Sequence, residues 1–183
     1  MSKKGFTTTN LHSDRLDKPE HGVLHKAIHT SVAYSYDDAR ELAEVFQGKR
    51  AGYNYGRQLN PTVTALQNRI TAMEEGIATA AFATGMAAIS SSMLALLRAG
   101  DHIVASTFLF GNTNSFFGTL QTLGIDVSFV DAPVSGGTKG ADEATLAIMA
   151  GGDAETVAQV TPILSALGRP VHVGPCGSGQ MCK

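Results

Sequence analysis

The hydrophobic and polar positions along the chain follow two alternating periods, which predict helices and strands in turn. Apolar residues three and four apart mark amphipathic helices, and short apolar runs between turn residues mark buried strands. Because strands alternate with helices, we expect an α/β fold with a largely parallel sheet and flanking helices. The expected helices cover 37–47, 61–75, 86–98, 112–123 and 154–167, and the expected strands cover 102–106, 126–131, 145–150 and 171–173.

The boundaries of these elements depend on capping and helix-breaking residues. Asn60 can cap the helix that begins at Pro61, a residue that suits the first turn of a helix. Pro162 should kink the last helix or start a second segment. We expect a Gly-rich loop over 133–144 and a final loop over 174–183.

One short apolar segment, 78–83, stays ambiguous, since periodicity fits either a buried strand or the lead-in to the next helix.

Composition and charge narrow the class of protein. Of 183 residues, 43% are hydrophobic and 16% are charged, which is typical of a globular protein with a real core. The formal net charge of −2 gives no sign of nucleic-acid binding. The sequence shows no 18-residue apolar run and no signal peptide after Lys3 and Lys4, so we expect no membrane span. Cys176 and Cys182 have no metal-site spacing, and we interpret them as reduced thiols of a cytoplasmic protein.

The first 36 residues are polar and predict an N-terminal arm. His21, His25 and His29 are four apart, a spacing that could stack them on one helix face. Carboxylate or cysteine partners at ligand spacing are lacking, so we interpret this stretch as a solvated arm and expect no metal site. An arm of this kind would lie on another subunit.

The segment Ala83 to Met86 has features of an anion cradle. It opens a helix, where free amides and the helix dipole favour a phosphate. Gly85 would allow the phosphate to approach the backbone closely. Alone, the pattern fits a plain tight turn equally well, because most turns that open a helix hold no phosphate.

Three motifs occur in an order that resembles one enzyme family. They are Y-N-Y-G-R-Q-L-N-P-T at 53–62, A-T-G-M-A-A-I at 83–89 and L-F-G-N-T at 109–113. Together they resemble the Cys/Met-metabolism family of pyridoxal-phosphate enzymes, which includes cystathionine gamma-synthase and the O-acylhomoserine sulfhydrylases. The resemblance covers residues 6–132.

This resemblance implies a cofactor-binding role for five residues. Gly85 and Met86 would give backbone amides to the cofactor phosphate, and Phe110, where many members have Tyr, would stack on the pyridine ring. Tyr55 and Arg57 would reach the phosphate of a neighbouring subunit, so the site would exist only in a homodimer. The chemistry agrees, since a guanidinium suits a phosphate dianion and an aromatic face suits a flat ring.

A second set of motifs resembles a different family, the 3-hydroxyisobutyrate dehydrogenases (β-hydroxyacid dehydrogenases). The motifs are D-A-P-V-S-G-G at 131–137, T-L-A-I-M-A-G-G at 145–152 and V-G-P-C-G-S-G-Q-M-C-K at 173–183. This resemblance implies that Ser135, Gly136 and Gly137 would hold a substrate carboxylate, and that Lys183 matches the catalytic lysine. The family's G-x-G-x-x-G fingerprint does not occur in the sequence, so we expect no NAD binding.

The two resemblances together predict a chimera in three regions. These are an N-terminal arm (1–36), a partial pyridoxal-phosphate-enzyme-like α/β region (37–132) and a partial Rossmann-like dehydrogenase fragment (133–183) fused to the same sheet. They share the tetrapeptide 129–132, so one sheet could run through the junction. Uncovered helix faces elsewhere in the chain would leave the fold incompletely packed.

We expect this arrangement to lack a complete active site and enzyme activity. No S-x-T-K-like stretch follows residue 132, so the first family's Schiff-base lysine has no counterpart, and neither has its pyridine-facing aspartate. Weak, non-covalent binding of pyridoxal phosphate is the most we expect. One alternative is a recombined or synthetic protein that binds a protein partner as an inhibitor or neutraliser. Another is a remnant hydroxyacid-binding loop without dehydrogenase activity.

Overall fold

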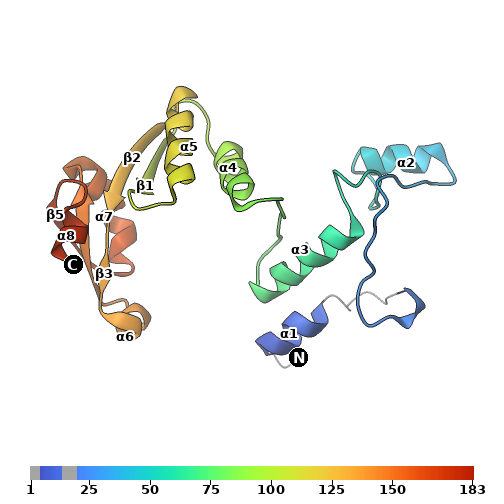
Figure 1. Ribbon diagram of the computed structural model, residues 1–183, viewed down its shortest axis with the longest axis horizontal. Helices are drawn as coiled ribbons and strands as arrows, with labels where there is room; N and C mark the ends of the chain where they lie inside the picture. Colours follow the sequence, from blue (N-terminus) through green and yellow to red (C-terminus); the bar gives the residue numbers. More distant parts are fainter. Residues whose placement is uncertain (1–4, 14–19) are drawn as a thin grey trace. The chain divides into compact units, whose positions relative to one another are not determined.

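The chain folds into two compact units, an N-terminal unit of residues 1–82 and a C-terminal unit of residues 83–183 (Figure 1). The computed structural model describes residues 5–13 and 20–183. Within those residues, no helix combines the length and the apolar character that crossing a membrane requires. The boundaries predicted at 36 and 132 stay predictions.

The N-terminal unit is helical and contains two helices with side-chain caps, of which the one at Asn60 was predicted. Its elements are α1 (Phe6–His12), the 3-10 helix η2 (Glu20–Gly22), α2 (Ala39–Phe46) and α3 (Pro61–Met73). The Asp38 carboxylate accepts a hydrogen bond from the backbone N–H of Arg40 at 2.8 Å. The Asn60 side chain accepts one from Thr62 N at 2.8 Å, and Pro61 opens α3 as expected. The helices predicted over 37–47 and 61–75 are therefore confirmed.

Between η2 and α2, the N-terminal arm is mostly irregular chain and lies along residues 54–56. Tyr34 N donates to Asn54 O at 3.2 Å, and Gly56 N donates to Val32 O at 2.6 Å. The helix face that could have stacked three histidines does not form, because the arm is irregular after η2. Helix α1 lies beside α3.

Apolar side chains of the N-terminal unit remain largely uncovered. Among its described residues, Val45 is the only buried hydrophobic one. Three apolar residues of α3, spaced three and four apart, form an apolar stripe that is exposed: Val63 is 42% exposed, Leu66 53% and Ile70 36%. This exposure agrees with the expectation of incomplete packing.

The C-terminal unit is built on a five-stranded sheet. Its strands are β1 (His102–Ser106), β2 (Asp126–Asp131), β3 (Val134–Ser135), β4 (Leu146–Gly152) and β5 (Gly168–Gly174). Their order is β1-β2-β4-β3, and β5 also pairs with β4. The longer pairings, β1 with β2 and β4 with β5, are parallel, and the short pairings of β4 with β2 and β3 are antiparallel. The predicted α/β class with a largely parallel sheet is thus confirmed.

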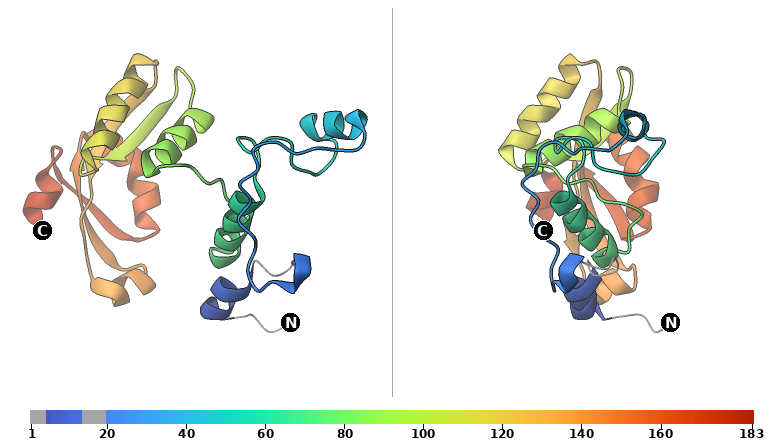
Figure 2. Two further views of the ribbon diagram at one scale, coloured as in Figure 1. Left: turned by 45° about the vertical axis from the view of Figure 1, so that its right-hand side comes forward. Right: turned by 90° about the vertical axis from the view of Figure 1, so that its right-hand side faces the viewer.

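Helices cover both faces of this sheet (Figure 2). The helices of this unit are α4 (Gly85–Leu96), α5 (Gly111–Thr122), α6 (Gly137–Asp142), α7 (Ala154–Ser165) and α8 (Ser178–Cys182), and α6 lies at the end of the sheet next to β3 (Figure 1). On one face, Phe117 and Leu120 of α5 form a core cluster with Ile125, against which the partly buried Phe129 of β2 packs. On the other face, Val157 of α7 packs with apolar residues of β2 and β4. Alternation along each strand explains why both faces are apolar.

Several predicted elements differ from the structure. Residues 78–83 form no strand and serve only as the lead-in to α4, because no neighbouring strand pairs with them. The predicted loop over 133–144 contains β3 and α6, and the predicted final loop contains α8. Helix α7 runs through Pro162 as one helix and ends at Ser165. Short glycine-rich elements escape detection because they carry no apolar period.

Candidate functional site

Two helix N-termini lie close together in the C-terminal unit. The Thr113 hydroxyl, in the first turn of α5, donates a hydrogen bond to the sulfur of Met86, the second residue of α4, at 3.6 Å. Thr113 is buried, with 7% of its surface exposed. The start of α4 is therefore fixed against the start of α5.

The first turn of α4 leaves backbone donors without a partner in the helix. The Thr84 side chain accepts from Ala87 N at 3.1 Å, and its carbonyl accepts the first intrahelical bond, from Ala88 N at 3.1 Å. The amides of Gly85 and Met86 precede that bond and cannot be satisfied within α4. A Cβ built on Gly85 would meet nothing within 4 Å, so the space beside this turn is open. Free donors, a helix dipole and open space together suit an anion.

Phe110 is the N-cap residue of α5 and is 69% exposed. Its carbonyl accepts hydrogen bonds from Thr113 N at 2.8 Å and Asn114 N at 3.2 Å, which fix the backbone of this residue. In the same turn, the side-chain oxygen of Asn114 is buried without a hydrogen-bond partner, and its amide nitrogen donates to Thr107 O at 3.4 Å. An exposed aromatic ring and an unsatisfied acceptor therefore accompany the free amides of α4.

Tyr55 and Arg57 lie together in the N-terminal unit. The Arg57 guanidinium carbon is 4.9 Å from the centroid of the Tyr55 ring, a cation–π contact. Tyr55 N donates to Asn54 Oδ1 at 2.6 Å, and Tyr55 bridges Ala33 of the arm. Arg57 itself is exposed. The five residues expected to hold a cofactor are thus divided between the units, with Gly85, Met86 and Phe110 in the C-terminal one.

The residues expected to bind a carboxylate lie at the turn between β3 and α6. Ser135 ends strand β3 and is not part of a loop, so the loop prediction was wrong for this residue. Gly136 has φ 141° and Gly137 has φ 61°, conformations that favour glycine. A Cβ on Gly136 would come within 3.1 Å of Leu146 Cδ2, so this glycine also permits packing. Lys183 follows α8.

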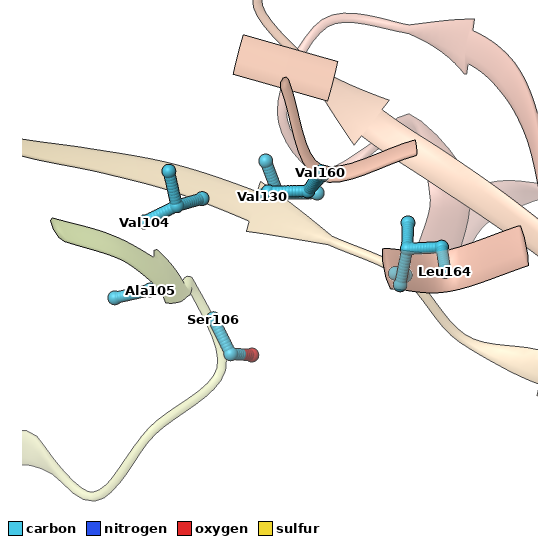
Figure 3. A pocket seen from close by; sticks show the side chains of 7 residues that line it. Val104, Ala105, Ser106, Val130, Val160 and Leu164 are labelled. Atoms are coloured by element: carbon cyan, nitrogen blue, oxygen red, sulfur yellow. The ribbon is translucent and has the colours of Figure 1, made fainter. Parts of the chain in front are cut away.

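An open apolar pocket of about 290 Å³ lies at the carboxyl ends of β1 and β2 (Figure 3). Its lining includes Val104 and Ser106 from β1, Val130 from β2, and Val160 and Leu164 from α7. Ser106 supplies the single hydroxyl of this lining. The pocket exists because α7 covers β2 and β4 more fully than it covers the edge strand β1.

The sequence-based reasoning missed the structural role of Asp131. This residue is 1% exposed, and its carboxylate accepts hydrogen bonds from Gly177 N at 2.5 Å and Gln180 N at 2.9 Å. A carboxylate at a strand end, together with a late glycine-rich run that offers free amides, was the available signal.

Comparison with known proteins identifies the family. The family model described as "Cys/Met metabolism PLP-dependent enzyme" matches residues 7–159. The chain belongs to this family. Its α/β fold agrees with a solved family structure, a putative O-acetylhomoserine (thiol)-lyase from Campylobacter jejuni described with N'-pyridoxyl-lysine-5'-monophosphate. That likeness has a TM-score of 0.65 and 26% identity, and it covers 70% of this chain and 32% of the other.

Curated family members are similar over the same part of the chain. O-acetyl-L-homoserine sulfhydrylase of Corynebacterium glutamicum is 41% identical over 130 residues, which is 70% of this chain and 30% of that protein. L-methionine gamma-lyase of Fusobacterium nucleatum subsp. nucleatum is 40% identical over 132 residues, 72% of this chain and 33% of that protein. The chain thus spans about a third of the length of the curated relatives it matches.

These findings support the first resemblance and lend no support to the predicted chimera or its dehydrogenase-like part. The family match passes the expected junction at residue 132 and continues to 159. The sheet runs past that point, as the shared tetrapeptide 129–132 allowed, because Val130 and Asp131 of β2 pair with Gly152 and Gly151 of β4.

Proposed function

We propose that this chain forms the phosphate-binding end of a pyridoxal-phosphate site of the transsulfuration type and binds the cofactor weakly and non-covalently. The observation that carries the proposal is the open first turn of α4, where the amides of Gly85 and Met86 have no partner in the helix beside the start of α5. Family membership supports the choice of this anion over others. When bound, pyridoxal phosphate supplies an electron sink for amino-acid chemistry.

Different residues at this turn bind the phosphate and the pyridine ring of the cofactor. The amides of Gly85 and Met86 donate to phosphate oxygens, and the positive end of α4 favours the negative charge. The exposed ring of Phe110 offers a face on which the pyridine ring stacks.

The remaining phosphate ligands come from a second copy of the chain, so the binding form is a homodimer. Tyr55 and Arg57 are presented together, and the Arg57 guanidinium is exposed for contact with a dianion. The exposed apolar stripe of α3, in the same unit, is surface that a dimer could bury.

The strength of binding follows from the number of charged contacts. Three charge-assisted hydrogen bonds at about 1.5–3 kcal/mol each give about 5–9 kcal/mol. Association costs at least ~4 kcal/mol of this, which leaves roughly millimolar affinity or weaker. We propose binding without efficient turnover for these 183 residues, because no S-x-T-K-like stretch follows the matched motifs.

The test is a calorimetric titration with pyridoxine 5′-phosphate, which lacks the aldehyde and therefore cannot attach to surface lysines. We expect saturable binding of roughly millimolar affinity, a cooperative thermal melt raised by the ligand, and no response to pyridoxine. Equal responses to pyridoxine and its phosphate would contradict a site built on the phosphate.

The other interpretations of the sequence stay predictions. They are the junction with a dehydrogenase-like segment over 131–183, a hydroxyacid-binding turn at Ser135 to Gly137, a protein partner and a cytoplasmic location. No specific contact of the described residues favours them over the cofactor site.

A further inference from the structure

The Asp131 carboxylate is buried at the end of β2, and both of its oxygens accept hydrogen bonds from backbone amides of the same chain. Oδ1 accepts from Gly177 N at 2.5 Å and Oδ2 accepts from Gln180 N at 2.9 Å. Both donors belong to the last stretch of the chain, where Gly177 precedes α8 and Gln180 lies within it. One side chain therefore joins β2 to residues 175–182, which follow β5 and which we call the C-terminal segment.

Glycines allow the C-terminal segment to lie directly against the sheet. A Cβ on Gly179 would collide with Met149 O of β4 and would lie 2.7 Å from Asp131 Oδ2. A Cβ on Gly151 would collide with Asp131 Oδ1 and would lie 2.8 Å from Gly179 N. Real Cβ atoms do not approach other atoms so closely, so both positions require glycine while the segment is seated.

The segment has one further polar contact, since the Thr107 hydroxyl and Cys176 Sγ are 2.8 Å apart, but it contributes no residue to either core cluster. Met181 is 89% exposed. Both clusters are built from β1, β2, β4, α4, α5, α7 and adjoining residues only. The segment therefore adds nothing to the apolar core, and the two hydrogen bonds to the buried Asp131 carboxylate, together with the contact between Cys176 and Thr107, attach it to the rest of the unit.

We propose that Asp131 is a latch: its carboxylate holds the C-terminal segment on the sheet, and loss of the carboxylate releases the segment as a unit while the sheet stays folded. The released segment would expose Asp131, Gly151 and the end of β4, and it would lose its contact with Thr107. Thr107 lies three residues before Phe110, in the loop that leads into α5. Because the seated segment contacts Thr107 through Cys176, Asp131 also restrains this loop.

The test is hydrogen exchange, followed by mass spectrometry, of the full chain and its Asp131→Asn variant. Asparagine keeps the shape of the side chain but turns an N–H toward one of the two backbone donors. We expect protection of residues 176–182 to fall on the order of tenfold or more, with peptides from β2 and β4 unchanged. The matched control is Asp153→Asn, since Asp153 also caps backbone amides, those of Glu155 and Thr156, but belongs to α7.

A second variant, Gly179→Ala, keeps the test decisive if Asp131→Asn does not fold. It displaces the segment by collision with Met149 O and by crowding Asp131 Oδ2, while the carboxylate group itself is kept. Loss of protection confined to residues 176–182 in this variant supports the latch. If either variant exchanges in the segment and in β4 to the same extent, or if a folded Asp131→Asn chain keeps the protection of the segment, the latch is overturned.

Discussion

The hydroxyl of Thr113 donates a hydrogen bond to the sulfur of Met86 at 3.6 Å, and this contact joins the first turns of α5 and α4. The free amides of α4 and the exposed ring of Phe110 therefore belong to one rigid corner of the C-terminal unit. A phosphate-bearing aromatic ligand requires such a pair of surfaces, one for the anion and one for the ring.

Replacing Gly85 with proline should weaken phosphate binding without disturbing the fold. Proline suits the first position of a helix, Thr84 already has the extended backbone that precedes a proline, and a Cβ at Gly85 meets no neighbour. The variant loses one charge-assisted hydrogen bond, so calorimetry with pyridoxine 5′-phosphate should show about a tenfold loss of affinity.

The matched control for that variant is Ala154→Pro, at the first position of α7, on the opposite face of the sheet. Asp153 caps Glu155 and Thr156 in that helix, so the amide of Ala154 is not needed. We expect unchanged affinity for the control. If the two proline variants bind pyridoxine 5′-phosphate with equal affinity, the backbone amides of α4 do not bind the phosphate.

Mixing two defective variants tests whether Arg57 serves the neighbouring subunit. Gly85→Pro and Arg57→Ala chains should each bind weakly alone, but each mixed dimer should contain one site with both residues intact. Random pairing should restore roughly a quarter of all sites. If Arg57 acts within its own chain, the mixture should bind no better than the two variants measured separately.

Truncating the ring at the start of α5 should reduce affinity to a smaller extent. Phe110→Leu loses the stacking contribution of about 0.5–1.5 kcal/mol, which corresponds to a fall of roughly two- to tenfold, whereas Phe110→Tyr should keep it. Phe108→Leu is the comparison, because Phe108 is 60% exposed in the same loop. A loss as large for Phe108→Leu would show a general effect of the loop instead of stacking.

The stability of the C-terminal unit should depend on α5. Leu120 is fully buried against Phe117 and Ile125, so Leu120→Ala should lower the free energy of unfolding by about 2–5 kcal/mol. Leu96→Ala, at a position 78% exposed, should change it by less than about 0.5 kcal/mol. Urea unfolding followed by far-ultraviolet circular dichroism measures both values.

Local signals predicted most of the fold, and contacts between distant residues account for the rest. The cap at Asn60 and the strand over 126–131 depend on neighbours in the chain, and the structure confirms both predictions. Residues 78–83 lacked a pairing strand, which their own sequence could not reveal. Helix α8 was not predicted, because the amides at its start and within it bond to Asp131, which is more than 40 residues earlier in the chain.

The candidate site shows the same division. The sequence indicates that Gly85 opens a helix, because capping and turn residues are local. It does not indicate that Met86 contacts Thr113, 27 residues later, or that Asn114 keeps an unsatisfied buried oxygen. Those contacts depend on how α4 and α5 pack. The packing places the free amides of α4, which suit a phosphate, close to the start of α5, where Phe110 offers an aromatic face.

The most direct test of the cofactor site is a nuclear magnetic resonance titration that follows the backbone amides of Gly85 and Met86. Pyridoxine 5′-phosphate should move both amide proton signals downfield along saturable curves with one shared affinity, and pyridoxine should leave them in place. Saturable movement of other amides, with those of Gly85 and Met86 unmoved, would contradict a phosphate site at the start of α4.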